Sequence, residues 1–251
     1  MSSHRRQQQN LLILGGTIEA RKIAAILVND PQWSVTLSLA GLTRQAQTIL
    51  GATRIGGFGG TKGLIDFIES RNVDTIVDAT HPFATVISAN ARSAARHTAR
   101  RYLSLCRPPW SPKPGDTWIN AADVPHAATL LPPGTRALLA IGHRNLAALF
   151  ARTDVTLFAR TIEPLGIRIP PHVRTILARP PFTVEDETSL LSEHKIGIVV
   201  AKNSGGAIVD TKLVAARMAR LPVIMIARPA HPKADAESVD QILSQLPYRS
   251  S

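Results

Sequence analysis

The chain has 251 residues, of which 44% are hydrophobic and 19% are charged, and this composition is typical of a globular protein with a substantial core. Its single cysteine excludes an internal disulfide, and no window holds the ~18 apolar residues of a membrane span. The apolar run at residues 11–14 is too short for the core of a signal peptide, so we expect a cytoplasmic protein with no membrane contact.

The formal net charge of +11 favours a polyanionic partner, such as nucleic acid, anionic lipid, a nucleotide cofactor or a polycarboxylate substrate. A basic surface that only maintains solubility is an equal alternative. Aromatic residues make up only 4% of the chain, whereas proteins that bind single strands stack bases on aromatic side chains. The arginines are also scattered rather than gathered in one tail or stripe. We therefore expect no nucleic acid and no obligatory protein partner, and a small anionic ligand instead.

The first half of the chain alternates short apolar runs with amphipathic segments. Strands are predicted at 11–14, 35–40, 74–80 and 102–106, and helices at 18–28, 62–71 and 88–100. Strands that alternate with helices are typical of a parallel sheet covered on both faces.

A helix is predicted at 123–131, and the Pro132-Pro133-Gly134 sequence that follows it is the candidate hinge between domains. The alternation then begins again. Strands are predicted at 137–141, 155–160, 175–178, 196–201 and 223–226, and helices at 183–194, 211–220 and 234–245. The fold class is therefore α/β, with two Rossmann-like parallel-sheet units and the active site in the cleft between them. Residues 1–133 are expected to form the dinucleotide-binding domain and residues 134–251 the substrate-binding domain.

The turn after the first predicted strand, Gly15-Gly16-Thr17, lies where a Rossmann-like fold binds phosphate. Glycines let the backbone approach a ligand, and the helix N-terminus offers unpaired N–H groups. Thr17 and Ala20 stand where the dinucleotide fingerprint prefers glycine, so a tight turn without ligand is the alternative.

The end of the second predicted strand lacks the acidic residue that NAD-binding folds offer to the ribose hydroxyls. Ser38, Thr43 and Arg44 are found there instead, and a guanidinium with two hydroxyls suits a ribose 2′-phosphate. This favours NADPH over NADH as the cofactor, although Arg44 is also explained as one solvated arginine among many.

Thr80 and His81 follow directly on the strand at 74–80, at the edge of the sheet where open α/β folds bind ligands. Pro82 restrains the backbone of His81. Both residues are expected to contact the cofactor, and His81 is also a candidate to bind a substrate carboxylate. A purely structural histidine is the alternative.

In the second half, Lys202, Asn203 and Ser204 form an equivalent turn with Gly205 and Gly206, and it suits an anion. The lysine precedes the glycines, so this is not a P-loop. Arg144 and Arg160 also follow or end predicted strands, so basic groups recur where substrate would bind. The eight histidines show no paired ligand spacing, and we expect no metal.

Five short segments carry a resemblance to a known family. They are Gly-Gly-Thr-x-Glu-x-Arg at 15–21, Asp-Ala-Thr-His-Pro-Phe-Ala at 78–84, Arg-Pro-Pro-Trp at 107–110, Lys-Asn-Ser-Gly-Gly at 202–206 and Arg-Pro at 228–229. In this order they resemble the precorrin-6A reductase family over nearly the whole chain. The resemblance implies NADPH-dependent reduction of one double bond of a tetrapyrrole, precorrin-6A, to give precorrin-6B in cobalamin biosynthesis. A related anaerobic branch reduces the cobalt-containing analogue, and the motifs do not separate the two branches well.

The resemblance also implies roles for single residues. The substrate carries a ring of carboxylates, which suits Arg107 and the basic residues above. Lys202 and Asp186 are the candidate catalytic residues, with Asp186 as the proton donor because the segment at 181–187 is expected to face the substrate. Glu185, Glu187 and water are the fallback donors, and acidic residues in a first turn also simply complement the helix dipole. A dinucleotide-binding regulator without chemistry remains the rival from another class, and a nucleic-acid binder is a more distant one.

Overall fold

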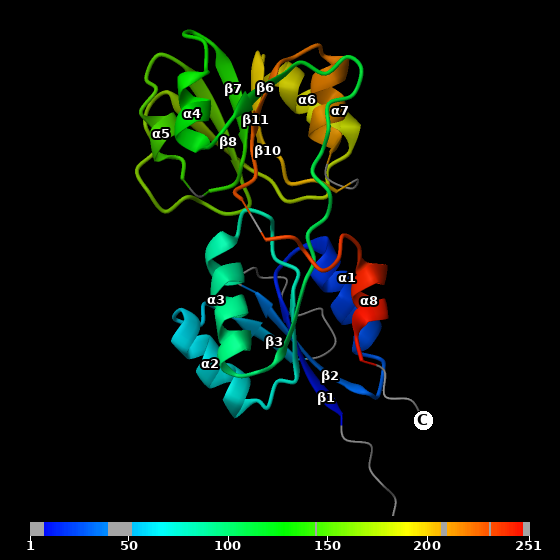
Figure 1. Cartoon of the computed structure of the whole chain (residues 1–251). Coiled ribbons are helices and arrows are strands. Elements are labelled where there is room, and N and C mark those ends of the chain that lie inside the picture. The colour runs from blue at the N-terminus through cyan, green and yellow to red at the C-terminus, as the bar shows by residue number, and fades with distance from the viewer. Residues whose placement is uncertain (1–7, 40–51, 144, 207–209, 231, 248–251) are drawn as a thin grey trace, which may run out of the picture. The chain divides into compact units, whose positions relative to one another are not determined.

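A computed structural model of the chain describes residues 8–39, 52–143, 145–206, 210–230 and 232–247 (Figure 1). It divides into two compact units. Unit 1 combines residues 1–107 with residues 229–251, and unit 2 consists of residues 108–228. The chain therefore passes from one unit to the other twice.

Unit 1 contains a five-stranded sheet in which every neighbouring pair is parallel. Its strands are β1 (Gln9–Leu14), β2 (Trp33–Leu39), β3 (Ala52–Ile55), β4 (Thr75–Asp78) and β5 (Arg101–Ser104). Its helices are α1 (Ile18–Leu27), α2 (Thr61–Ser70), α3 (Thr85–His97) and α8 (Val239–Gln245). The strand order β3-β2-β1-β4-β5 is that of the nucleotide-binding half of a Rossmann fold, whose ligands bind beyond the carboxyl ends of the strands.

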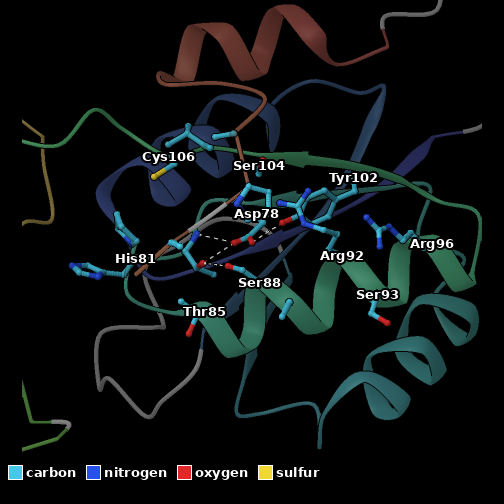
Figure 2. Close-up of a pocket in the computed structure, with 17 residues that line it drawn as sticks. Asp78, His81, Thr85, Ser88, Arg92, Ser93, Arg96, Tyr102, Ser104 and Cys106 are labelled. Carbon is cyan, nitrogen blue, oxygen red and sulfur yellow. Dashed lines mark hydrogen bonds between the residues drawn. The ribbon is translucent and has the colours of Figure 1, made fainter. Parts of the chain in front are cut away.

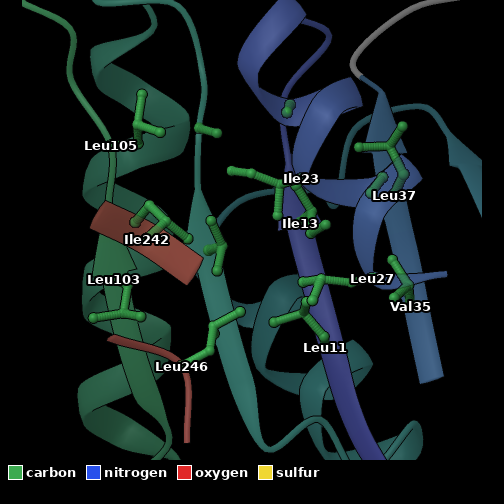
Figure 3. Close-up of a cluster of buried hydrophobic side chains, with 14 of the residues drawn as sticks. Leu11, Ile13, Ile23, Leu27, Val35, Leu37, Leu103, Leu105, Ile242 and Leu246 are labelled. Carbon is green, nitrogen blue, oxygen red and sulfur yellow. The ribbon is translucent and has the colours of Figure 1, made fainter. Parts of the chain in front are cut away.

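The core of unit 1 lies on both faces of β1, because successive side chains of a strand point to opposite faces. Leu11 and Ile13 pack with α1, while Leu12 and Leu14 pack with α2 and α3. The closing helix also belongs to this core, since Ile242 is fully buried in the cluster that contains Leu11 and Ile13 (Figure 3). Residues more than 200 positions apart in the chain thus share one core.

Unit 2 contains a six-stranded parallel sheet in the order β6-β11-β10-β7-β8-β9. Its strands are β6 (Trp118–Ala121), β7 (Arg136–Ala140), β8 (Thr156–Thr161), β9 (Val173–Leu177), β10 (Ile198–Lys202) and β11 (Val223–Ile226). Its helices are α4 (Val124–Thr129), α5 (Ala147–Phe150), α6 (Val184–Glu193) and α7 (Thr211–Met218). Buried side chains of α6 and α7, such as Leu191 and Leu213, pack on Phe158 and Val199 of the sheet. Figure 1 shows α4 and α5 on the opposite face of this sheet.

The predicted fold class, two parallel-sheet α/β units, is confirmed. The boundary between the units is not where the sequence placed it, at residues 133 and 134. Pro132-Pro133-Gly134 is instead a loop inside unit 2, between α4 and β7. The prediction failed because β6, which it did not foresee, pairs with β11, so that the segment from Pro108 already belongs to the second sheet.

No helix in the described part of the chain is both long enough and apolar enough to cross a membrane.

Candidate functional site

The turn from β1 into α1 brings the ends of β1 and β4 close together. Gly15 has a φ of +126°, and a Cβ on it would lie 2.6 Å from the carbonyl oxygen of Ala79. Only glycine fits this position without moving the backbone. Thr17 fixes the turn, because its hydroxyl donates to the Ala79 carbonyl at 2.7 Å and accepts the amide of Ala20 at 3.1 Å.

The same turn leaves amide hydrogens available. Within the described residues, the N–H groups of Gly16, Ile18 and Glu19 donate to no protein acceptor. A Cβ on Gly16 would make only one ordinary contact, 3.7 Å from Leu39 Cδ2, so the backbone is open there. Free amides at a helix N-terminus suit the pyrophosphate of a dinucleotide, and the residues present therefore fit such a cofactor.

Ser38 pairs with Leu14 across β2 and β1, and its carbonyl accepts the amide of Gly15 at 3.0 Å. Its side chain is buried at the carboxyl end of β2, close to the glycine turn. Thr43 and Arg44, the other residues predicted to bind the ribose phosphate, lie outside the described residues. Their roles stay predictions.

The carboxyl end of β4 holds a buried carboxylate. Asp78 is only 4% exposed and accepts three hydrogen bonds, from the Thr80 amide (3.1 Å), the Thr80 hydroxyl (2.7 Å) and the Tyr102 phenol (2.8 Å) (Figure 2). Burial, and then the neighbouring Asp78, raise the pKa of Tyr102 well above its ordinary value. The phenol therefore stays protonated and donates to the Asp78 carboxylate, which in turn holds Thr80 at the start of the loop.

Thr80 and His81 are both at this edge, as predicted. The Thr80 hydroxyl also lies 3.1 Å from the hydroxyl of Ser88 on α3. His81 accepts the amide of Phe83 at its Nδ1 atom at 3.2 Å, so a neutral ring carries its proton on Nε2. Figure 2 shows His81 directed away from Asp78.

A cavity of about 340 Å³ opens beside this loop, between α3, the ends of β4 and β5, and residues Ala230, Pro232 and Ala234. Its polar lining includes Asp78, Thr80, His81, Ser88, Arg92, Arg96 and Tyr102. Neither the two arginines nor the tyrosine was predicted from the sequence as a site residue. The available signal was the spacing of Arg92 and Arg96, four residues apart on a helix without acidic residues.

Arg107 was predicted to bind substrate. Its Nη1 atom lies 2.7 Å from Oε2 of Glu19, in the first turn of α1, and both side chains are largely buried, while its role toward substrate stays a prediction. This ion pair ties the end of the first segment of unit 1 to the helix that follows the glycine turn.

The Lys-Asn-Ser-Gly-Gly turn follows β10 in unit 2. Lys202 donates from Nζ to the carbonyl of Ile141 at 2.8 Å, and the Ser204 hydroxyl donates to the Lys202 carbonyl at 3.2 Å. Asn203 uses both ends of its amide on the main chain of Trp110, at 2.8 and 3.0 Å. The side chain of Asn203 is therefore committed to holding the turn.

Three of the five segments that carry the family resemblance, at 107–110, 202–206 and 228–229, are bonded to one another around this turn. The indole of Trp110 donates to the Gly206 carbonyl at 2.8 Å, and Nε of Arg228 donates to the Asn203 carbonyl at 2.7 Å. Gly205 has a φ of +66°, and a Cβ on it would lie 2.0 Å from the Pro108 carbonyl oxygen. Mutual packing thus accounts for these residue types without any ligand.

Arg160 is also engaged within unit 2. Its Nη1 atom lies 2.8 Å from Oε2 of Glu187, with the two side chains 9% and 2% exposed, and its guanidinium lies over the Phe182 ring at 4.4 Å. Arg144 lies outside the described residues.

The three candidate acids in α6 have different surroundings. Asp186 forms a capping box: its carboxylate accepts the Thr183 amide at 2.9 Å, and its own amide donates to the Thr183 hydroxyl at 3.1 Å. Asp186 and Glu185 are exposed, whereas Glu187 is buried against Arg160. The alternative role of these residues as helix-capping groups therefore has direct support. In the described part of the chain no three His, Cys, Asp or Glu side chains gather as a group able to hold a metal ion.

The structure therefore brings together the glycine turn with Thr80 and His81, at the carboxyl ends of the neighbouring strands β1 and β4 in unit 1. This arrangement defines an α/β protein with a Rossmann-like first unit, a class that includes many nicotinamide-dependent enzymes. The chain belongs to the family Precorrin-6x reductase CbiJ/CobK, whose model matches residues 10–247. The resemblance stated from the sequence is confirmed.

Individual relatives agree with the family. A precorrin-6A reductase of Rhodococcus erythropolis is 46% identical over 239 residues, which cover 95% of this chain and 96% of the relative. A cobalt-precorrin-6A reductase of Priestia megaterium is 30% identical, over 87% of this chain and 90% of the relative. Among solved structures, CobK precorrin-6A reductase matches with a TM-score of 0.86 and 38% identity, covering 94% of this chain and 96% of that one.

Proposed function

We propose that this chain reduces one double bond of precorrin-6A with NADPH and yields precorrin-6B, a step of cobalamin biosynthesis. The observation that carries the proposal is the similarity to precorrin-6A reductase of Rhodococcus erythropolis over almost the full length of both chains. The family match over residues 10–247 and the similar solved structure support it. A cytoplasmic location is part of the proposal.

The reductase family implies a nicotinamide cofactor, and the turn from β1 to α1 fits one. The amides of Gly16, Ile18 and Glu19 would hold its pyrophosphate, with Gly15 and Thr17 fixing the turn. The choice of NADPH rests on the sequence: Ser38 and Leu39 end β2 without an acidic residue, and Arg44 would meet the 2′-phosphate.

When bound, the nicotinamide supplies the hydride. The residues of this chain then have three tasks: to orient the reacting groups, to bind the carboxylates of the substrate and to provide a proton. In unit 1 the loop at Thr80 and His81 would orient the reacting groups. Asp78 holds this loop with two hydrogen bonds from Thr80 and is itself held by a third from Tyr102. A loop held in this way presents His81 in a fixed place, which limits the entropy lost when ligand binds.

Carboxylate binding falls to the basic residues. Lys202 is the candidate in unit 2, since it ends β10 at the start of the glycine-rich turn and its ammonium carries a positive charge. Arg107 and Arg160 have carboxylate partners within the chain, at Glu19 and Glu187, so substrate would have to share guanidiniums that are already bonded. Asn203 and Ser204 would contribute through the shape of the turn.

Asp186 is the proposed proton donor. It is exposed at the start of α6, and protonating the carbon next to the one that receives the hydride requires a group within hydrogen-bond reach. One of its carboxyl oxygens also accepts the Thr183 amide, so the capping box holds the group at the first turn of α6.

The test is turnover by the purified chain with precorrin-6A and NADPH, followed by the loss of NADPH absorbance. Cobalt-precorrin-6A serves as the comparison substrate, because a relative of that name is also similar, at a lower identity of 30%. We expect faster reduction of precorrin-6A. NADPH binding without consumption in the presence of either substrate would refute an enzymatic role and favour a dinucleotide-binding regulator.

A further inference from the structure

The cavity beside α3 in unit 1 is lined by Thr80 and His81, which have roles above, and by two arginines that have none. Two arginines line it, Arg92 and Arg96, together with one carboxylate, Asp78. Arg92 and Arg96 are four residues apart on α3, so both side chains lie on the same face of the helix. Figure 2 shows Arg92 extending from α3 toward Asp78 and Tyr102.

Among the residues that the structure describes, no ion pair neutralises the positive charge of these two arginines. Within the described residues, neither Arg92 nor Arg96 forms a salt bridge. Arg92 is half-buried and lies over the Tyr102 ring at 4.9 Å, so an aromatic face holds it rather than a carboxylate. Asp78, the carboxylate among the described lining residues, already accepts three hydrogen bonds from neutral donors, and Asp235 behind the lining accepts both the amide and the hydroxyl of Ser104.

Small donors surround the arginines. The hydroxyl of Ser88 lies on the same helix face, and Thr85 and Ser93 also line the cavity. Guanidinium groups with adjacent hydroxyls are well suited to a carboxylate, which accepts up to four hydrogen bonds. With a volume of about 340 Å³, the cavity is at the low end of the roughly 300–1,000 Å³ of small-molecule pockets. It therefore suits one edge of a large ligand rather than a whole macrocycle.

The sheet topology separates this cavity from the phosphates of a dinucleotide. In a Rossmann-like unit the pyrophosphate binds at the turn after β1, and the ribose 2′-phosphate lies beside β2. The cavity is at the ends of β4 and β5, on the other side of β1 in the order β3-β2-β1-β4-β5. Its arginines are thus placed for an anion that is not a phosphate of the cofactor.

We propose that Arg92 and Arg96 form a carboxylate subsite that binds one acidic side chain of the tetrapyrrole substrate. The proposal rests on the proposed function for the identity of the substrate. It adds α3 to the substrate-binding surface, to which the sequence had assigned His81 and Arg107 in unit 1 and otherwise residues of the second half. It also gives α3 a role in orienting the macrocycle beside Thr80 and His81.

The test is equilibrium binding of precorrin-6A without NADPH, followed by quenching of tryptophan fluorescence, in Arg92→Gln, Arg96→Gln and the wild type. Each substitution should weaken precorrin-6A binding by about tenfold or more, as expected for losing one charge-assisted hydrogen bond, and leave the Kd for NADPH unchanged. Arg92→Lys should recover part of the affinity. Arg100→Gln is the matched control, because Arg100 follows the same helix, pairs with Asp74 and does not line the cavity.

Melting curves of all variants verify the fold, and exposed Arg96 offers a substitution that removes no packing. Binding of precorrin-6A within twofold of the wild type in both glutamine variants would overturn the subsite. Weaker NADPH binding with unchanged precorrin-6A binding would assign the arginines to the cofactor and overturn it equally. If the wild type binds precorrin-6A but never consumes NADPH with it, the proposed function fails while the variants still decide the subsite. A wild type that does not bind precorrin-6A overturns both.

Discussion

The buried ion pair between Arg160 and Glu187 gives the sharpest prediction about unit 2. Glu187→Gln keeps the volume of the side chain and removes its charge, leaving the Arg160 guanidinium buried without a counter-charge. The pair links β8 to α6 across 2.8 Å, with side chains only 9% and 2% exposed. Removing one partner of such a pair costs about 3–5 kcal/mol of the free energy of unfolding.

The corresponding thermal shift follows from the size of the unit. Unit 2 has about 120 residues, and an unfolding entropy of about 2.1 cal/mol/K per residue converts this loss into a Tm lower by about 12–20 °C. Urea unfolding followed by tryptophan fluorescence is the assay, since Trp110 and Trp118 are both in unit 2. The midpoint should fall while the slope stays constant.

A double substitution separates the structural part of Arg160 from its proposed contact with substrate. Arg160→Met with Glu187→Leu replaces the pair by apolar side chains, and such replacements are often neutral or stabilising. If Arg160 also binds a substrate carboxylate, the double variant should be stable yet have a raised KM for precorrin-6A. A Glu187→Gln variant that loses less than about 1 kcal/mol would refute the reasoning, because it would mean that the pair is hydrated in solution.

Three further predictions concern the cofactor and the proton. Gly15→Ala should lower NADPH affinity at least tenfold and destabilise unit 1 by about 1–3 kcal/mol, because its Cβ would lie 2.6 Å from the Ala79 carbonyl oxygen. Gly57→Ala, with open space at its Cβ, is the control in the titration and the melt. Arg44→Ala should weaken NADPH about 10- to 100-fold more than NADH in parallel titrations, and equal losses would contradict the 2′-phosphate assignment. Asp186→Asn should preserve the melting temperature, since its amide oxygen can still accept the capping hydrogen bond, yet lower turnover by about 100- to 10,000-fold. Near-normal turnover would leave water as the proton source.

Local patterns predicted most elements of the fold. The apolar run at 11–14 became β1, and the helix expected at 18–28 became α1 at Ile18–Leu27. These segments are long or strongly patterned, so periodicity alone identifies them. The edge strand β3 and the short strand β6 were missed, because four mixed residues at a sheet edge carry little pattern. The helix at α3 begins at Thr85 rather than Ser88, and its first turn contributes Thr85 to the cavity.

The sequence predicted where some candidate site residues lie, but not which charged side chains are already bonded within the chain. Sequence order reveals which residues follow a strand, so the turn at Gly15 and the loop at Thr80 were found. It does not reveal which charged side chains are already paired. Arg160 stood out by its position, but its partner Glu187 lies 27 residues away on another element. Arg92 was not predicted as a site residue because it lies in the middle of a helix, where an arginine usually indicates only a solvated face.

The double passage of the chain between the units imposes an order on biosynthesis. Ile242 and Leu246 complete the core around Leu11, yet the ribosome makes them only after every residue of unit 2. Until they are made, the first 107 residues lack part of the hydrophobic core on one face of their sheet. Unit 2, which is residues 108–228, can complete its own core first. The N-terminal unit is the first to be synthesised and the last to be completed, and a transcript that stops before Ile242 yields a finished unit 2 beside an unfinished neighbour.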